Sequence, residues 1–345
     1  ELFVGYKLKV NKANKIGLQN NVQYQNELKS YRNQLSKNYT SDSKVTSALI
    51  KEGHDRLQQE IRASHILIMV DENASPEDTL IAYRQAVEIR NKAVAGQDFG
   101  KLAQDFSQDP SAKENLGDLG YFSSFRMVYA FENAAYNTPK GQISKPIRTR
   151  FGYHVIKVND VRANRGEVAV AHIMLMNNKE GATPESIKNN INDIYKKIQQ
   201  GESFEELAKQ FSEDKSSSTK GGVLNRFGSG QLSSQEFEDV AFSLTKDNAI
   251  SQPFQSQFGW HIVKLLDKFP VKGLEESKVD LENKIEKDDS SRLITNSLTE
   301  KLRKKYKIKR DDKVYANVSK LVTNDFYEGK WETPENIKDY STSTL

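Results

Sequence analysis

The chain has 345 residues, of which 36% are hydrophobic and 28% are charged, so it can hold two or three domains with small cores and wide exposed surfaces. Its 51 basic and 47 acidic residues are interleaved and leave a net charge of +4, which gives no reason to expect nucleic acid as a partner. The absence of cysteine excludes disulfides, thiolate catalysis and cysteine-bound zinc. No hydrophobic run has the length of a membrane-spanning helix.

Residues 1–62 have a helical pattern, which predicts an N-terminal helical segment. Leu28, Tyr31 and Leu35, for example, fall at i, i+3 and i+7 on one face. A helix cannot bury such a stripe alone, so this segment must pack on another part of the protein. The sequence opens as if within a helix, and no signal segment precedes it. We therefore expect the chain to be a trimmed piece of a longer protein.

An internal repeat dominates the middle of the chain. The segment 151–158, which reads FGYHVIKV, returns at 258–265 as FGWHIVKL. A second histidine strand, ASHILI at 63–68, returns at 170–175 as VAHIML. In both pairs the later histidine follows the earlier one by 107 residues, from 65 to 172 and from 154 to 261. This spacing predicts two related domains, at 63–161 and 167–269, with a short polar joint at 162–166.

Each repeat is expected to be an α+β domain. In the first, the strand of His65 is followed by a long helix that begins at Ser75-Pro76-Glu77, where a capping serine precedes a proline at the first helical position. A short helix, a glycine-punctuated turn at 116–122 and another short helix come next. Two strands that meet at a corner near Gly152 close the unit. The order β-α-α-(β)-α-β-β predicts a small mixed or antiparallel sheet with helices, and the second repeat has the same order.

The residues after the repeats predict more helix and then a polar tail. A charged helical pattern covers 272–308, with a break near 288–291. Its apolar positions also need a partner, and residues 1–62 are the obvious one. We therefore expect a helical domain built from the N- and C-terminal segments. Residues 309–345 are polar and are expected to be a tail or a linker to a missing region.

Two histidines and one acid recur in each repeat, as His65, His154 and Asp109 in the first. Buried histidines that only hydrogen-bond inside a sheet would explain the pattern without a function, and the residues alone leave this reading open. A metal is not expected, because the histidines lie on separate strands without a short ligand spacing. A nucleophilic triad is not expected either, since neither Ser107 nor Ser123 lies on a glycine-flanked elbow.

Several motifs together resemble the parvulin type of peptidyl-prolyl cis/trans isomerase domain. They are the strand ASHIL, the loop FSQDPSAK, the turn GDLGYF, the helix FENA and the strand FGYHVIKV, and two copies of the set cover about 200 residues. Two such copies flanked by helical segments resemble periplasmic folding factors of the SurA and PrsA type, in which the N-terminal helical segment is chaperone-like. That resemblance implies a periplasmic location, unfolded or extended proline-containing polypeptides as partners, and peripheral association with the envelope. It implies no cofactor or metal and leaves the oligomeric state open.

The resemblance also implies site residues in both copies. The catalytic positions fall on His65, Asp109, Thr149 and His154 in the first repeat, and on His172, Asp214 and His261, with Ser256 at the hydroxyl position, in the second. The proline-binding positions fall on Leu119, Met127 and Phe131, and on Leu224, Leu232 and Phe237. The second copy departs from the family in its glycine turn (Val223, Asn225 and Arg226) and carries one extra residue between Leu232 and Phe237. Asp71-Glu72-Asn73 stands where phosphate-specific relatives carry basic residues, so phosphate specificity is not expected.

The expected reaction is rotation about an X–Pro amide, which faces a barrier of about 18–20 kcal/mol and breaks no bond. An apolar pocket would grip the proline ring and remove water, which favours the less polar twisted amide. The histidine pair would act as a hydrogen-bonded scaffold and not as a general base. The alternative is a non-catalytic, peptide-binding chaperone with silent repeats. A third reading, a scaffold subunit of an envelope assembly, depends on the region expected beyond residue 345.

Overall fold

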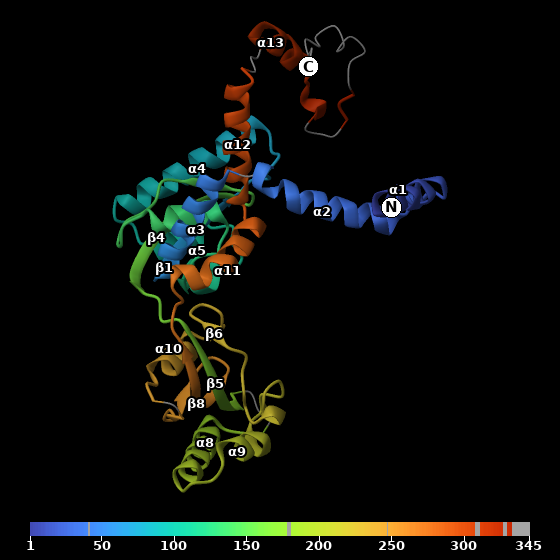
Figure 1. Cartoon of the computed structure of the whole chain (residues 1–345). Coiled ribbons are helices and arrows are strands. Elements are labelled where there is room, and N and C mark those ends of the chain that lie inside the picture. The colour runs from blue at the N-terminus through green and yellow to red at the C-terminus, as the bar shows by residue number, and fades with distance from the viewer. Residues whose placement is uncertain (41, 178–180, 247, 308–310, 327–329, 333–345) are drawn as a thin grey trace. The chain divides into compact units, whose positions relative to one another are not determined.

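The computed structural model describes all residues except 41, 178–180, 247, 308–310, 327–329 and 333–345 (Figure 1). The described chain divides into two compact units. The first unit contains residues 1–51 and 282–322, and the second contains residues 52–281 with part of 323–332. Within the described residues, no helix is both long enough and apolar enough to cross a membrane.

The first unit is helical and joins both ends of the chain, as the sequence predicts. It contains α1 (Leu2–Lys15), η1 (Leu18–Asn20), α2 (Val22–Thr40), the start of α3 (Ser43–Leu57), the end of α11 (Leu274–Lys287), α12 (Ser291–Lys305) and α13 (Asp312–Leu321). Asp42 accepts a hydrogen bond from Ser297 and forms an ion pair with Lys301, which ties the start of α3 to α12. These two bonds hold the pKa of Asp42 at about 2.

The first repeat is an antiparallel sheet with helices on both faces. Its elements are β1 (Gln59–Met69), α4 (Pro76–Val94), α5 (Phe99–Phe106), α6 (Ala112–Asn115), β2 (Asp118–Phe122), α7 (Tyr129–Tyr136), β3 (Ile147–Thr149) and β4 (Gly152–Ala163). The strand order is β2-β1-β4-β3. Alternate side chains of β1 divide between two cores. Ile66 and Ile68 pack with α4 and α5, whereas Ile61 and Ala63 pack with Phe131 of α7.

The second repeat has the same arrangement. Its elements are β5 (Glu167–Met176), α8 (Pro184–Gln199), α9 (Phe204–Phe211), η2 (Ser218–Lys220), β6 (Phe227–Gly228), α10 (Gln235–Ser243), β7 (Phe254–Gln255) and β8 (Gly259–Phe269), with the strand order β6-β5-β8-β7. One core lies between the sheet and α8 and α9, and the other contains Phe237 of α10. The predicted α+β class and repeated order are confirmed.

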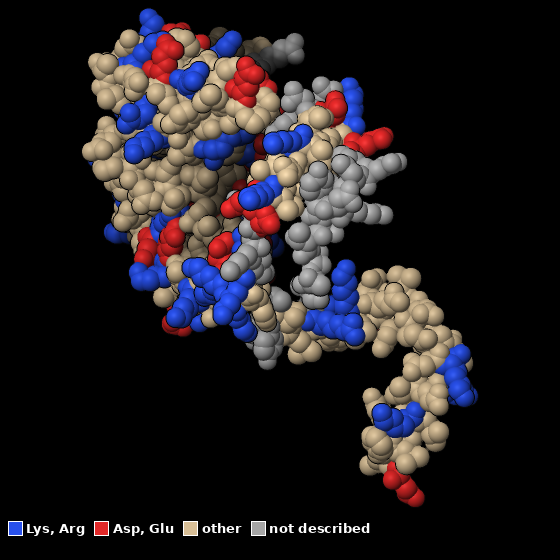
Figure 2. Space-filling view, turned by 90° about the horizontal axis from the view of Figure 1, so that it is seen from above, with Lys and Arg blue, Asp and Glu red and all other residues tan. Residues whose placement is uncertain are grey.

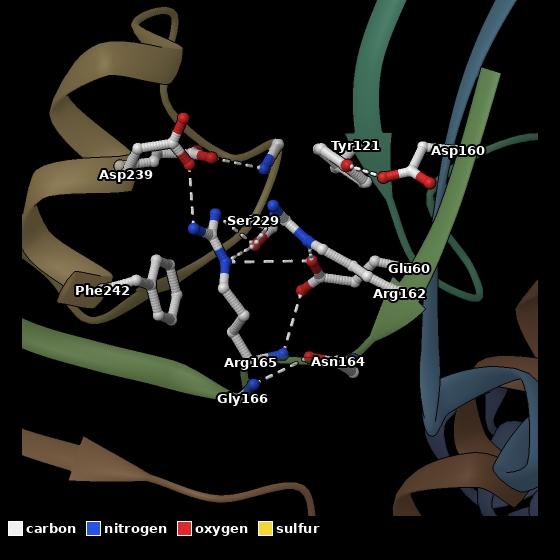
Figure 3. Close-up of polar contacts among 12 residues, drawn as sticks. Glu60, Tyr121, Asp160, Arg162, Asn164, Arg165, Gly166, Ser229, Asp239 and Phe242 are labelled. Carbon is white, nitrogen blue, oxygen red and sulfur yellow. Dashed lines mark hydrogen bonds and ion pairs between the residues drawn. The ribbon is translucent and has the colours of Figure 1, made fainter.

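A polar cluster joins the two repeats within the second unit (Figure 3). Glu60 of β1 is 1% exposed, and its carboxylate accepts hydrogen bonds from Arg162 Nε at 2.7 Å and from the Arg165 amide at 3.3 Å. Both arginines also donate to Ser229 Oγ in the second repeat, and Arg165 Nη1 donates to Asp239 at 2.9 Å. A buried carboxylate is stable only when it is paired, and here its partners are Arg162 near the end of β4 and Arg165 in the joint between the repeats.

Aromatic rings complete this cluster. The Arg162 guanidinium lies 3.4 Å from the centre of the Tyr121 ring in the first repeat, and that of Arg165 lies 4.1 Å from the centre of the Phe242 ring in the second. Stacking on a ring orients a guanidinium while its N–H groups bond to oxygen atoms. The joint is therefore held by specific bonds and is shorter than the predicted 162–166, because β4 continues to Ala163 and β5 begins at Glu167.

The glycine of the repeated FG(Y/W)H motif is required by a close approach between strands. Gly152 has φ +145°, and a Cβ there would lie 2.1 Å from the Ile68 carbonyl oxygen. A Cβ added at Gly259 of the second repeat would likewise lie 2.1 Å from the Leu175 carbonyl oxygen. Any side chain would therefore push β4 away from β1, or β8 away from β5.

Gly152→Ala should lower the free energy of unfolding by about 1–3 kcal/mol, because it combines a strained backbone with a steric clash. Gly141→Ala is the matched control, since Gly141 has φ +84° but open space around the added Cβ. Urea unfolding of both variants separates the clash from the backbone cost. Equal losses of stability would show that the close approach of the strands contributes nothing.

Two sequence expectations need correction. The first strand begins at Gln59 and not at 63, because residues 59–62 pair with the last residues of β4. The predicted tail 309–345 contains the helix α13, which Asp311 caps by accepting bonds from the amides of Lys313 and Val314. The parts of that tail at 309–310, 327–329 and 333–345 lie outside the described residues.

Candidate functional site

The two histidines of the first repeat face the same core. His65 on β1 and His154 on β4 come from neighbouring antiparallel strands, where His65 is paired with Ile156 and His154 with Leu67. Both histidines are almost fully buried, at 6% and 5% exposed. Their rings are nearly parallel, with centres 5.5 Å apart. The sheet register therefore brings together residues that are 89 positions apart in the sequence.

A continuous chain of hydrogen bonds runs through the pair. Asp109 Oδ2 lies 2.7 Å from His65 Nε2, and the Nδ1 atoms of the two histidines are 3.2 Å apart. His154 Nε2 lies 2.8 Å from Thr149 Oγ1, which accepts a bond from the Phe151 amide at 3.2 Å. At the other end, Asp109 Oδ1 accepts bonds from the amide and the hydroxyl of Ser111. All four predicted catalytic residues of this repeat thus belong to one network.

The carboxylate sets the direction of these bonds. An ionised Asp109 can only accept, so the proton of a neutral His65 is on Nε2 and its Nδ1 is an acceptor. His154 must then donate from Nδ1, and its Nε2 accepts the proton of Thr149. Every polar atom of both rings is satisfied while both histidines stay neutral. The network can hold the site in one shape without moving a proton.

The pKa values agree with this charge distribution. Burial, together with the neighbouring His65, lowers the pKa of His154 to about 3. Burial also lowers the pKa of His65, although Asp109 opposes the shift. Burial alone would raise the pKa of Asp109, but the bonds from Ser111 and His65 outweigh it and leave that pKa below its usual value. Near neutral pH the site holds two neutral imidazoles and one carboxylate.

The predicted proline-binding residues lie against the same core, on the side of α7. Phe131 is 3% exposed, and its ring meets both histidine rings edge-on, with centres 5.7 and 5.3 Å apart. Leu119 and Met127 are partly buried and pack against the same cluster. Phe131 is therefore a floor beneath the site, and the two half-exposed side chains are the ones that a ligand can reach.

The second repeat reproduces most of this geometry. His172 Nε2 lies 2.7 Å from Asp214 Oδ2, and His261 Nε2 lies 2.7 Å from Ser256 Oγ. Phe237 meets both rings edge-on, and Leu224 and Leu232 pack on its core. Burial and the neighbouring His172 lower the pKa of His261 to about 4. The glycine turn differs, because β6 has only two residues where β2 has five.

One buried acid in each repeat was not predicted from the sequence. Glu132 of α7 is 3% exposed and accepts bonds from the Phe125 amide, Ser124 Oγ and Arg56 Nη1. Glu238 of α10 accepts bonds from three successive amides, of Gly230, Gln231 and Leu232. Each glutamate thus fixes the loop that carries a predicted proline-binding residue. Their recurrence directly after Phe131 and Phe237 was a signal available in the sequence.

Acidification should destabilise this site through its buried histidines, whose pKa values are lowered by burial. The pKa of His154 is about 3 in the folded chain against 6.5 when exposed, so below pH 6.5 only the unfolded chain takes up that proton. The stability contributed by the neutral ring is complete above pH 6.5 and falls as pH drops towards 3. At pH 5 the loss for one such histidine is about 2 kcal/mol.

Urea unfolding at pH 7.5 and pH 5 measures this loss. His154→Gln cannot take up a proton in this range, so its stability should depend less on pH. An unchanged pH dependence in that variant would contradict the assignment of the effect to His154.

Comparison with known proteins identifies the family of both repeats. Residues 47–162 and 172–267 each match a family model described as a PPIC-type PPIASE domain, that is, a peptidyl-prolyl isomerase domain. Both repeats belong to this family. The first match begins within α3, ahead of the predicted boundary at residue 63, and the second lies inside the predicted 167–269.

Similar proteins include bacterial folding factors. The chaperone SurA of Pseudomonas aeruginosa is 35% identical over 233 residues, which are 66% of this chain and 55% of that protein. The chaperone SurA of Salmonella typhimurium is 32% identical over 242 residues, or 69% of this chain and 54% of its own. The solved structure of the peptidylprolyl isomerase PrsA of Bacillus anthracis covers 56% of this chain and 79% of its own, at 29% identity and a TM-score of 0.27. The chain spans about half the length of these curated relatives.

Proposed function

We propose that the protein is a peptidyl-prolyl cis/trans isomerase that also holds unfolded polypeptides. The observation that carries the enzymatic part is the closed network Asp109–His65–His154–Thr149 beneath the half-exposed Leu119 and Met127. Membership of both repeats in the PPIC-type family supports it. No cofactor or metal is needed, because the reaction is a rotation and not a bond cleavage.

In the proposed mechanism the network is a rigid frame and not a proton relay. A proline ring would rest on Leu119 and Met127 above Phe131, with water excluded from the amide on that side. Twisting the amide removes its resonance and part of its polarity, so the apolar surface favours the twisted state over the planar one. The neutral histidines keep Asp109 and the strand ends in place throughout.

The chaperone part rests on the first unit. Many large apolar side chains of α1 and α2 are exposed, among them Leu2, Phe3, Tyr6, Leu8, Tyr31 and Leu35. Such surfaces bind extended apolar segments of unfolded chains. Figure 2 shows basic and acidic side chains interspersed on the face it presents, which suits clients of mixed charge better than a polyanion. Unfolded proline-containing chains in the periplasm are the proposed clients, after the SurA chaperones that the chain resembles.

Two assays on the whole chain separate the enzyme from the silent-repeat alternative. A protease-coupled assay measures isomerisation of a proline tetrapeptide, and light scattering measures aggregation of an unfolded client. We expect activity in both. Suppressed aggregation without isomerisation would support the binding chaperone with silent repeats and contradict the proposed enzyme.

A further inference from the structure

The second site contains two buried nitrogens without a hydrogen-bond partner among the described residues. They are Nδ1 of His172 and Nδ1 of His261. In the first repeat the equivalent atoms of His65 and His154 are bonded to each other at 3.2 Å. Buried polar atoms rarely lack a partner, so the difference between the repeats requires a cause.

The two unpaired atoms are complementary. Ser256 Oγ accepts a bond from the Phe258 amide and lies 2.7 Å from His261 Nε2, so its hydroxyl can donate to that nitrogen as Thr149 does to His154. A neutral His261 then carries its own proton on Nδ1. His172 carries its proton on Nε2, facing Asp214, which leaves a lone pair on its Nδ1. The donor and acceptor of the bond seen in the first repeat are both present, but the ring centres are 5.9 Å apart instead of 5.5 Å.

A side chain next to the second histidine pair differs between the repeats and explains why the two rings are further apart. Ser217, which is 1% exposed, donates to Asp214 Oδ2 and lies 3.1 Å from His172 Nε2. His172 thus has two acceptors on the side away from His261. The equivalent residue of the first repeat is Ala112, which is fully buried and has no polar side-chain atom. Among the residues that the structure describes, His65 Nε2 therefore has only Asp109 as a partner.

A second difference lies on the opposite side of the pair. Phe254 stacks on His261, with ring centres 5.4 Å apart, where the first repeat has Ile147 paired with His154. Stacking holds His261 from its far face but supplies no hydrogen bond to either free nitrogen. The Ser217 hydroxyl lies against His172 Nε2, the nitrogen that carries the proton of that ring. We therefore assign the wider separation of the two histidine rings to Ser217.

We propose that Ser217 is a positioning residue that holds the second histidine pair open, and that Ala112 allows the first pair to close. The consequence for activity rests on the proposed isomerase function: the first site is the rigid, competent one, and the second is weakened by a single hydroxyl. Removing that hydroxyl should transfer the first geometry to the second repeat.

Nitrogen NMR of the whole chain, labelled with ¹⁵N at histidine, tests the geometry without any need for activity. Wild type should show one hydrogen-bonded Nδ1–H in slow exchange, which His154→Gln removes. Ser217→Ala should add a second, and Ala112→Ser should abolish the first. Ser216→Ala is the matched control, because Ser216 bonds to Asp214 Oδ1 but to neither histidine. A Ser217→Ala spectrum with only the original signal would overturn the proposal. Phe254→Ile tests the competing difference, and a second signal that appears in that variant but not in Ser217→Ala would also overturn it.

Isomerase activity provides a second test of the proposal. In an Asp109→Ala background, where the first site is disabled, Ser217→Ala should raise the remaining isomerase activity about fivefold, the factor that one ordinary neutral hydrogen bond is worth. If the wild-type protein shows no isomerase activity, the proposed function is wrong. The NMR result then decides the role of Ser217 by itself. An unchanged rate together with a closed second pair would refute the link between that pair and activity.

Discussion

Asp109→Ala should lower kcat/KM of the whole chain for a proline tetrapeptide by about tenfold or more, because a hydrogen bond to a charged group is worth about 1.5–3 kcal/mol. The variant removes the carboxylate that accepts from His65 Nε2, and with it the group that fixes the proton positions of both rings. Asp214→Ala should reduce the rate much less, since the second pair is already uncoupled.

Asp109→Asn is the matched control for this prediction. Its amide oxygen can still accept the bond from His65, so the rate should lie between those of wild type and Asp109→Ala. Phe131→Ala should also lower activity, but it opens a cavity beneath both rings and costs about 3–5 kcal/mol of stability. Its activity must therefore be compared with its folded fraction. A folded Asp109→Ala protein with full activity would show that the site assignment is wrong.

Glu132→Ala should lower the free energy of unfolding by about 3 kcal/mol, because it removes the more deeply buried of the two carboxylates that pair with Arg56 and leaves the half-exposed Glu52 as that arginine's remaining ion-pair partner among the described residues. Arg56 is 8% exposed and lies 3.2 Å from Glu132, and burial raises the pKa of this glutamate. The variant also removes the carboxylate that accepts bonds from the Phe125 amide and from Ser124 Oγ, so the loop that carries Met127 is less firmly held.

Chemical unfolding checks this prediction, and Glu132→Gln serves as its control. Glutamine keeps the shape and an acceptor oxygen but lacks the charge, so its stability should fall less. In the second repeat Glu238 bonds to three amides, and Glu238→Ala should cost only about 1–3 kcal/mol for the unsatisfied donors. Equal losses for Glu132→Ala and Glu238→Ala would contradict the importance of the buried arginine.

Local patterns were enough to predict the fold class and the order of elements. The serine cap of α4 is present, with Ser75 accepting from the Asp78 amide, and the break near 288–291 separates α11 from α12. The repeat spacing also placed equivalent residues correctly, because antiparallel pairing keeps the histidines of each repeat in the same register.

Other features depend on contacts that no local pattern encodes. Glu60 looked like part of a helix, yet it is a buried strand residue whose two arginine partners follow about 100 positions later. Leu119, Met127 and Phe131 were grouped as one pocket, but only their packing shows that Phe131 lies beneath the histidines. The open second pair depends on a few tenths of an ångström between rings, which residue types alone do not determine.

The most direct test of the central claim is the isomerase rate of the whole chain beside that of the double variant Asp109→Ala/Asp214→Ala, with both proteins shown to be folded. Wild type should accelerate cis/trans exchange of a proline tetrapeptide, and the double variant should approach the uncatalysed rate while still suppressing client aggregation. Equal catalysis by the two proteins would contradict the claim that the carboxylate–histidine networks form the isomerase sites.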